Sequence, residues 1–249
     1  DCDAACADLL SELFVKQIEA SSIACMVMEP VMGEGGFIVP PKEYVQKVKA
    51  ICEENGILFV SDEIQAGVAR TGKMFAIEHF DVVPDLITTA KSLAAGMPIS
   101  AVVGSRKIMD SVHPGGVGGT YSGNALGCAA GLAVLDILES EDLFTRANVL
   151  GDKIRTRFEA FKETFSIVGD VRGLSGMMAM ELVLDKETKA PAPELANALK
   201  TFCFEKGLML LATGTYGNVI RILSPLVITD DQLEQGLNIM EQGFAAIGK

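Results

Sequence analysis

A β-α-β pattern near the start of the chain constrains its fold more than any other feature. Residues 22–30 (SIACMVMEP) and residues 57–63 (ILFVSDE) are short apolar runs typical of strands. Between them, residues 40–56 predict a helix that begins at a proline pair and ends at Gly56. Strands that read as continuous apolar runs are typical of a parallel sheet covered on both faces. We therefore expect an α/β fold with a mostly parallel sheet.

The same pattern continues through the first half of the chain. Residues 85–90 and 99–105 predict two further strands, and residues 124–140 predict a long helix rich in Ala, Gly and Leu. The 249 residues, 49% of them hydrophobic, provide enough apolar material for two cores. We assign residues 1–146 to a first, larger domain.

A second pattern begins near residue 141 and predicts a smaller α+β domain over residues 147–249. Its expected elements are a charged amphipathic helix (141–165), a turn followed by a strand (168–183), a helix (193–206), two strands (207–213 and 218–228) and a final helix (230–247). A polar loop and a glycine-containing turn separate these elements.

Charge and cysteine use exclude several classes of protein. Thirty-three acidic and 21 basic residues give a formal net charge of −12, which repels nucleic acid and anionic lipid. No apolar run approaches the roughly 18 residues that cross a bilayer, and the first residues lack a secretory signal. The six cysteines are scattered without CxxC pairs, which indicates a reducing compartment such as the cytoplasm. Neither His79 nor His113 stands at a metal-ligand spacing, so we expect no metal site.

One lysine stands in an unusual setting. Residues 86–100 (LITTAKSLAAGMPIS) place Lys91 between apolar and small residues, with no acidic residue in the stretch. The apolar neighbours are Leu86, Ile87, Leu93 and Met97. Burying an ammonium among them is costly, so either Lys91 points to water or the protein removes its charge. A lysine with a lowered pKa is a nucleophile that can form an imine with an aldehyde.

Polar residues follow each apolar run, where open α/β sheets gather functional groups. They are Glu29, Glu34, Asp62, Glu63, Gln65 and Lys91. An aldehyde cofactor such as pyridoxal 5′-phosphate also needs a carboxylate that keeps its ring nitrogen protonated. Asp62 can supply it, and on a strand Ile64 would point to the same side, against the ring. A helix cap or a salt bridge would explain a strand-terminal Asp as well.

The order and spacing of several motifs together are more specific. EPVMGEGGFIVPP, LFVSDEIQAGVARTGKMFA, LITTAKSLAAGMPISAVVG and GGTYSGNALGCAAGLAVL resemble the class III (subgroup II) pyridoxal-phosphate-dependent aminotransferases, and within them the members acting on 4-aminobutyrate. The likeness continues through GDVRGLSGMMAMEL and NVIRILSPLVI and covers essentially the whole chain. It implies the fold-type I architecture, with a large parallel-sheet domain and a small C-terminal domain. It also implies a homodimer or a dimer of dimers.

The resemblance implies a role for each matching residue of the cofactor site. Lys91 would bond to pyridoxal 5′-phosphate and shuttle the proton, and Asp62 would pair with the pyridinium nitrogen. Gln65 would donate near the cofactor's 3′-oxygen. Thr120 would bind the phosphate across the dimer interface, from the neighbouring subunit. A turn or helix cap at Thr120 would give the same sequence pattern.

For the substrate, the resemblance assigns three residues. Arg221 would bind the α-carboxylate, for which its two-pronged guanidinium is suited. Glu34 would be a switch that pairs with Arg221 when an ω-amine is bound and swings away for glutamate. Glu29 would support the same pocket, or form a plain structural salt bridge. A permanent Arg221–Glu34 ion pair with a purely structural role is the alternative.

The sequence departs from the family pattern in one respect. Family members carry an N-terminal portion with a Gly/Ser-rich turn for the phosphate and an aromatic residue that stacks on the ring. Neither is found here, so we expect a partial chain with a partial large domain and weak or no cofactor binding by itself.

Three functions follow from these patterns. The first is an ω-aminotransferase that moves the amino group of 4-aminobutyrate, or a similar ω-amine, to 2-oxoglutarate, giving succinate semialdehyde and glutamate. The second is another class III enzyme, such as an ornithine or acetylornithine aminotransferase, an aminomutase or a racemase. The third is an inactive fragment that retains only fold and interface.

Overall fold

The computed structural model describes residues 3–248, which form two compact units. The first unit contains the residues up to Pro30 together with 40–69 and 73–142. The second contains Val31–Val39, Arg70–Gly72 and the chain from Leu143 onward. The domain limits expected from the sequence, 1–146 and 147–249, stay a prediction. Two short segments of the earlier sequence lie in the second unit.

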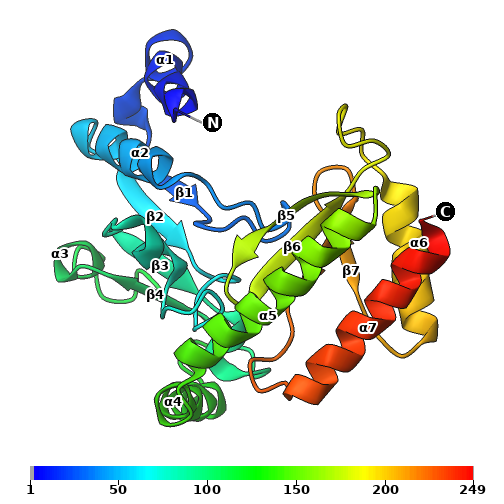
Figure 1. The fold of residues 1–249 in the computed structure, drawn as a ribbon. Coiled ribbons are helices and arrows are strands. Elements are labelled where there is room, and N and C mark those ends of the chain that lie inside the picture. The colour runs from blue at the N-terminus through cyan, green and yellow to red at the C-terminus, as the bar shows by residue number, and fades with distance from the viewer. Residues whose placement is uncertain (1–2, 249) are drawn as a thin grey trace. The chain divides into compact units, whose positions relative to one another are not determined.

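The first unit is built on a four-stranded sheet (Figure 1). Its strands, in spatial order, are β1 (Cys25–Met28), β2 (Leu58–Asp62), β3 (Leu86–Thr89) and β4 (Ala101–Gly104). The first three are parallel, and β4 pairs with β3 in the antiparallel sense. The expected α/β fold with a mostly parallel sheet is therefore confirmed.

Helices precede, connect and follow these strands. The first unit contains η1 (Ala5–Ala7), α1 (Asp8–Lys16), η2 (Ala20–Ser22), α2 (Lys42–Glu54), η3 (Ala76–Phe80), η4 (Lys91–Ala94), α3 (Arg106–Met109) and α4 (Ala125–Ser140). Helix α2 links β1 to β2 and buries Val45, Val48 and Ile51, spaced three residues apart on one face. It begins directly after Pro41, whose fixed φ suits a helix start.

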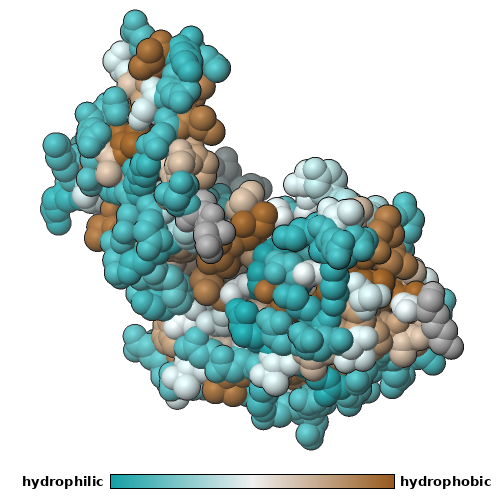
Figure 2. All heavy atoms as spheres, turned by 45° about the horizontal axis from the view of Figure 1, so that its top comes forward, coloured by the Kyte–Doolittle hydropathy of each residue, from teal (hydrophilic) through white to brown (hydrophobic). Residues whose placement is uncertain are grey.

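Helix α4 is apolar around much of its circumference. A helix of that composition is usually buried, yet Leu126 and Leu132 are exposed in the described part of the chain. Apolar side chains reach the surface elsewhere too, as the brown patches in Figure 2 show. Among residues 3–248, no helix combines the length and apolar content needed to cross a membrane.

The second unit is an antiparallel sheet with three long helices (Figure 1). Its strands, in spatial order, are β5 (Val168–Leu174), β6 (Met177–Leu182), β8 (Val219–Ile222) and β7 (Leu211–Thr213). Its helices are α5 (Leu143–Thr164), α6 (Pro193–Glu205) and α7 (Asp230–Ile247). Helix α5 packs against β5 and β6, and α6 packs against α7. The central β6 strand is almost wholly buried, as its mostly apolar sequence predicts, and its one charged residue, Glu181, is half-buried.

Two sequence predictions for this unit were wrong in detail. Residues 168–183 were expected to hold one strand but form a hairpin, because β5 carries glycine and charged residues that hide its alternation. The strands expected over 207–213 and 218–228 are shorter, and the second cannot extend through Pro225, which has no N–H to donate.

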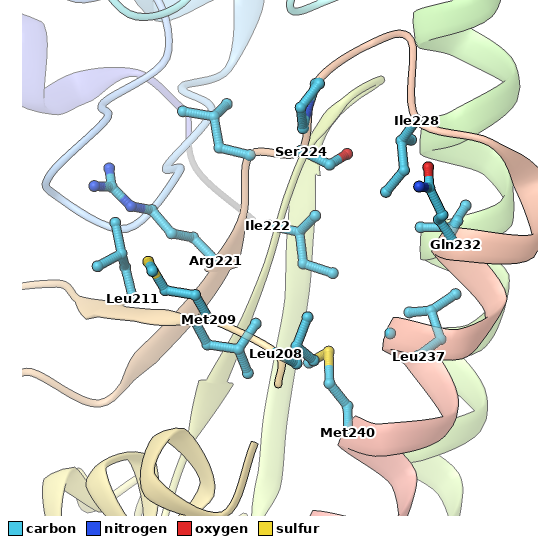
Figure 3. A pocket seen from close by; sticks show the side chains of 15 residues that line it. Leu208, Met209, Leu211, Arg221, Ile222, Ser224, Ile228, Gln232, Leu237 and Met240 are labelled. Carbon is cyan, nitrogen blue, oxygen red and sulfur yellow. The ribbon is translucent and has the colours of Figure 1, made fainter. Parts of the chain in front are cut away.

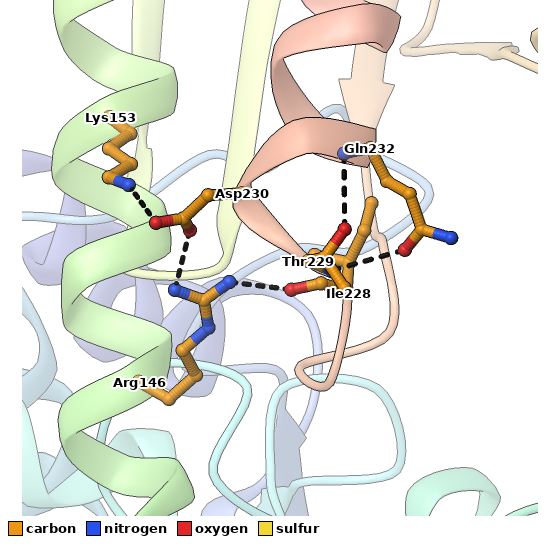
Figure 4. Close-up of polar contacts among 6 residues, drawn as sticks. All are labelled: Arg146, Lys153, Ile228, Thr229, Asp230 and Gln232. Carbon is orange, nitrogen blue, oxygen red and sulfur yellow. Dashed lines mark hydrogen bonds and ion pairs between the residues drawn. The ribbon is translucent and has the colours of Figure 1, made fainter.

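The start of α7 is fixed by a cap and by charge (Figure 4). The Gln232 N–H donates to Thr229 Oγ1 at 3.2 Å, and the Thr229 N–H donates to Gln232 Oε1 at 3.1 Å. Asp230 accepts from Lys153 Nζ at 2.5 Å and Arg146 Nη1 at 2.8 Å, and these α5 side chains lower the pKa of its carboxyl. The cap fixes the start of α7, and the two ion pairs of Asp230 attach that start to α5.

Cysteine burial provides a test of the fold. Cys203 is buried on α6, and burial raises the pKa of its thiol to about 11, whereas Cys25 and Cys128 are exposed. Because the thiolate is the reactive form, we expect iodoacetamide at pH 8 to label Cys203 at least about 100-fold more slowly than Cys25 in the folded chain. Mass spectrometry of the labelled peptides measures both rates. Equal rates in the folded chain would contradict the buried position, and equal rates in urea are the control.

Candidate active site

Three polar residues that the sequence pattern singled out lie along one edge of the first unit's sheet. Because β1, β2 and β3 are parallel, their carboxyl ends share that edge. Glu29 follows β1, Asp62 is the last residue of β2, and Lys91 comes two residues after β3. Asp62 is paired in register with Thr88 of β3, three residues before Lys91.

The turn after β2 holds Asp62 in a defined geometry. The Ile64 N–H donates to Asp62 Oδ1 at 3.0 Å. The strand ends at Asp62, so the expectation that Asp62 and Ile64 share one side of a strand is wrong. This hydrogen bond turns the backbone after Asp62, so the strand does not continue to Ile64. Gln65, in the same turn, is buried.

Glu63 secures this turn, a role that the sequence analysis missed. It is 1% exposed and accepts hydrogen bonds from the Ala76 and Ile77 N–H groups, both at 2.8 Å, and from Ser61 Oγ at 3.0 Å. Burial raises the pKa of the Glu63 carboxyl, although these hydrogen bonds act in the opposite direction. An acidic residue inside a buried segment was the available signal, because such a residue needs several donors.

Lys91 lines a cavity of about 690 Å³ in the first unit. The other lining residues are Ala90, Pro98, Ile99, Ser100 and the segment from Gly119 to Asn124. Lys91 is exposed, which agrees with the first of the two alternatives that the sequence left open, a side chain that points to water. The side chain stands at the start of η4 and faces an open cavity. Its φ of +45° is rare for a residue with a side chain, and such strain concentrates at functional sites.

Thr120 lines the same cavity as Lys91 within one chain. It lies in the loop before α4, where the Asn124 side chain caps the helix by accepting from the Gly127 N–H at 2.7 Å. Its predicted contact across a dimer interface stays a prediction.

The composition of the cavity fits the expected cofactor. An amine can form an imine with an aldehyde, and hydroxyl groups beside the start of a helix can bind a phosphate. The buried hydroxyls of Thr88 and Thr89 have no hydrogen-bond partner among the described residues, which leaves polar atoms on β3 for a ligand or water.

In the second unit, Arg221 and Glu34 form an ion pair. Arg221 lies on β8 and is buried, and its Nη2 atom is 2.8 Å from Glu34 Oε1. The guanidinium also lies over the Phe37 ring, 5.6 Å from the ring centre. By contrast, 72% of the Glu34 side chain is exposed. A buried arginine with an accessible partner can exchange that partner for another carboxylate.

A separate apolar cavity of about 380 Å³ lies beside Arg221 in the same unit. Its walls are Leu208 to Leu211, residues 221–225 and the inner side of α7 with the turn before it. Figure 3 shows the Arg221 guanidinium turned away from the α7 side chains Leu237 and Met240. The charged end of Arg221 therefore serves the ion pair with Glu34 and not this cavity.

Comparison with known proteins assigns the family. The family model described as Aminotransferase class-III matches residues 1–244. Among curated relatives, a probable 4-aminobutyrate aminotransferase of Bacillus subtilis is 51% identical over 95% of this chain and 54% of its own length. A leucine/methionine racemase of Thermococcus litoralis is 42% identical over 99% of this chain and 55% of its own length.

A solved structure agrees. The taurine:2-oxoglutarate aminotransferase from Bifidobacterium kashiwanohense, in complex with PLP and glutamate, matches with a TM-score of 0.90 at 31% identity, over 97% of this chain and 55% of that chain. This chain thus spans about half the length of the relatives it matches. The resemblance predicted from the sequence is confirmed, and the chain belongs to the class-III aminotransferase family.

Proposed function

We propose that the whole protein is a pyridoxal-phosphate-dependent aminotransferase that moves the amino group of 4-aminobutyrate, or a similar ω-amine, to 2-oxoglutarate. Its products would be succinate semialdehyde and glutamate. The observation that carries the choice of substrate is the Arg221–Glu34 ion pair. Family membership and the 4-aminobutyrate relative support the reaction class.

Residues of the first unit would perform the chemistry. When bound, the cofactor supplies an electron sink that stabilises negative charge on the substrate carbon. The Lys91 amine would take the proton from that carbon and deliver it to the cofactor carbon that carried the aldehyde, so that the amino group stays with the cofactor. The Asp62 carboxylate holds a proton on the ring nitrogen, Gln65 donates near the 3′-oxygen, and Thr120 binds the phosphate. Ile64 would provide apolar contact to the ring from the turn after β2, not from the strand itself.

Residues of the second unit would recognise the substrate. Glutamate carries a carboxylate next to its amine, and 4-aminobutyrate does not. An arginine aimed at that position lacks a partner whenever an ω-amine is bound, and a desolvated, unpaired charge is costly. Glu34 neutralises Arg221 in that half of the cycle and gives way to the glutamate carboxylate in the other. Glu29 would support the same pocket.

The Glu34→Gln variant tests this proposal. We expect the ratio of kcat/KM for 4-aminobutyrate to kcat/KM for glutamate to fall about tenfold, since one charge-assisted hydrogen bond is worth roughly that factor. Glutamate turnover should be preserved or improved. Both half-reactions are measured separately in the whole protein. Glu234→Gln is a matched control, because Glu234 forms another exposed ion pair, with Arg157. An equal loss in both half-reactions would indicate a structural ion pair and remove the case for an ω-amine.

The racemase relative favours a second candidate, in which the amine returns to its own substrate. Such an enzyme turns over an amino acid without any 2-oxo acid, whereas an aminotransferase stops after one half-reaction. Dependence of turnover on added 2-oxoglutarate separates the two. An inert fragment is distinguished by the cofactor's absorbance, recorded on this chain and on the whole protein.

We also propose a cytoplasmic homodimer, or a dimer of dimers, as the working assembly. The described cysteines are all free thiols, which suits a reducing compartment. Small amines and 2-oxo acids would be the partners, and the charge of −12 argues against nucleic acid.

A further inference from the structure

The loop that carries Glu34 is part of the second unit, although its neighbours in sequence belong to the first. The Met32 N–H donates to Ile38 O at 3.0 Å, and the Phe37 N–H donates to Met32 O at 2.8 Å. These bonds close residues 32–38 into a compact loop with Glu34 on it. Phe37 is fully buried beneath the Arg221 guanidinium.

One side chain of β5 joins this loop to the sheet. Arg172 Nε donates to the Gly36 carbonyl oxygen at 2.8 Å. The Nη1 atom of the same guanidinium donates to Asp170 Oδ2 at 2.9 Å and Glu181 Oε2 at 2.6 Å. Two carboxylates of the sheet therefore fix the plane of the guanidinium, and its remaining edge holds the loop backbone.

The fit between loop and sheet is tight at Gly36. Its φ is +99°, and a Cβ there would lie 3.0 Å from Val219 Cγ2 and 3.1 Å from Arg172 Nη2. A second backbone bond runs from the Gly214 N–H to Glu34 O at 3.0 Å. The largely exposed Glu34 side chain is not confined by packing, so the position of its carboxylate depends on these backbone contacts.

We propose that Arg172 is a positioning residue that sets substrate preference by holding the 32–38 loop so that Glu34 reaches Arg221. This inference rests on the proposed exchange of partners at Arg221. Arg172 touches no substrate in this scheme. It stabilises the loop position in which Arg221 is neutralised, and so favours ω-amines over α-amino acids.

Arg172→Lys tests the proposal without removing the charge that pairs with Asp170 and Glu181. A lysine keeps that attraction but lacks the Nε–H that reaches Gly36. Arg155→Lys is the matched control, because Arg155 Nη2 donates to the carbonyl oxygen of Gly173, also on β5, at 2.8 Å, and not to the 32–38 loop. The first measurement is hydrogen exchange of the peptide covering residues 31–39, made on the chain as it is.

We expect exchange of that peptide to be about tenfold faster in Arg172→Lys and unchanged in Arg155→Lys. In the whole protein, the kcat/KM ratio of 4-aminobutyrate to glutamate should fall severalfold in Arg172→Lys alone. Combining it with Glu34→Gln should add little further loss, because both changes would act through the same Glu34–Arg221 ion pair. If the fall in this ratio in the double variant equals the product of the two single falls, Arg172 acts elsewhere and the proposal is overturned.

Unchanged exchange in Arg172→Lys would also overturn it, since the loop would then be held without Arg172. Faster exchange with an unchanged substrate ratio would reduce Arg172 to a structural residue. Failure of the proposed function is recognised separately, as an absence of ω-amine turnover in the wild-type protein. The exchange experiment would still show whether Arg172 holds the 32–38 loop.

Discussion

Replacing Lys91 with alanine in the whole protein is expected to lower kcat by at least about 10³-fold, the range that general acid–base and covalent catalysis supply. Borohydride treatment should leave no cofactor covalently attached to the variant. The reason is the proposed double role of this amine, which would both bond to the cofactor and move the substrate proton. Stability should change little, because Lys91 is exposed and strained, and alanine removes only a solvated side chain.

Lys73 provides the matched control for that experiment. It is also exposed and lies in a turn of the same unit, where its Nζ donates to the Glu78 carbonyl oxygen at 3.4 Å. We expect Lys73→Ala to keep normal turnover and labelling. Peptide mass spectrometry after borohydride reduction identifies the modified lysine. A label at Lys73 with Lys91 unmodified would overturn the assignment.

The second large effect is expected for Asp62→Asn, which should lower kcat by about 10²- to 10³-fold while the free energy of unfolding changes by less than about 1 kcal/mol. A neutral amide cannot keep the cofactor's ring nitrogen protonated, so the electron sink is weakened. The fold tolerates the change because the asparagine Oδ1 atom can still accept the hydrogen bond from the Ile64 N–H.

Asp85→Asn should behave in the opposite way. Asp85 stands just before β3 and accepts from the Phe59 N–H at 2.8 Å and from Lys49 Nζ at 2.9 Å. Losing its charge should destabilise the chain by about 1 kcal/mol and leave kcat close to the wild-type value. Urea unfolding and steady-state kinetics on both variants give the comparison. Wild-type rates in Asp62→Asn would rule out its role at the ring nitrogen.

The sequence predicted those parts of the fold that local pattern determines. The β1-α2-β2 unit was found because its strands are apolar runs and its helix has a proline start and a glycine stop. Helix α7 covers Asp230–Ile247, the range expected from the sequence. The β5–β6 hairpin was missed because glycine and arginine interrupt the apolar alternation of β5, although its tertiary partners bury it.

The candidate site shows the same division between local and tertiary information. The sequence pointed to Asp62 and Lys91 because both are polar residues at the ends of apolar runs. Parallel strands bring their carboxyl ends to one edge of the sheet, so these two positions come together there. The exposure of Lys91 depends on what surrounds η4, which no short motif encodes. The roles of Glu63 and Arg172 depend on backbone groups 13 and 136 residues away along the chain, at Ala76 and Gly36. Such contacts are visible only in three dimensions.

The four-stranded sheet of the first unit has a consequence for handling the protein. Among the described residues, β1 pairs only with β2 and β4 only with β3, so both outer strands present open hydrogen-bonding edges. Val27 on β1 and Val102 and Val103 on β4 are at least half exposed beside those edges. Open apolar edges template strand addition between molecules. These open strand edges would therefore explain self-association of this chain in solution. The proposed functional dimer is better tested with the whole protein.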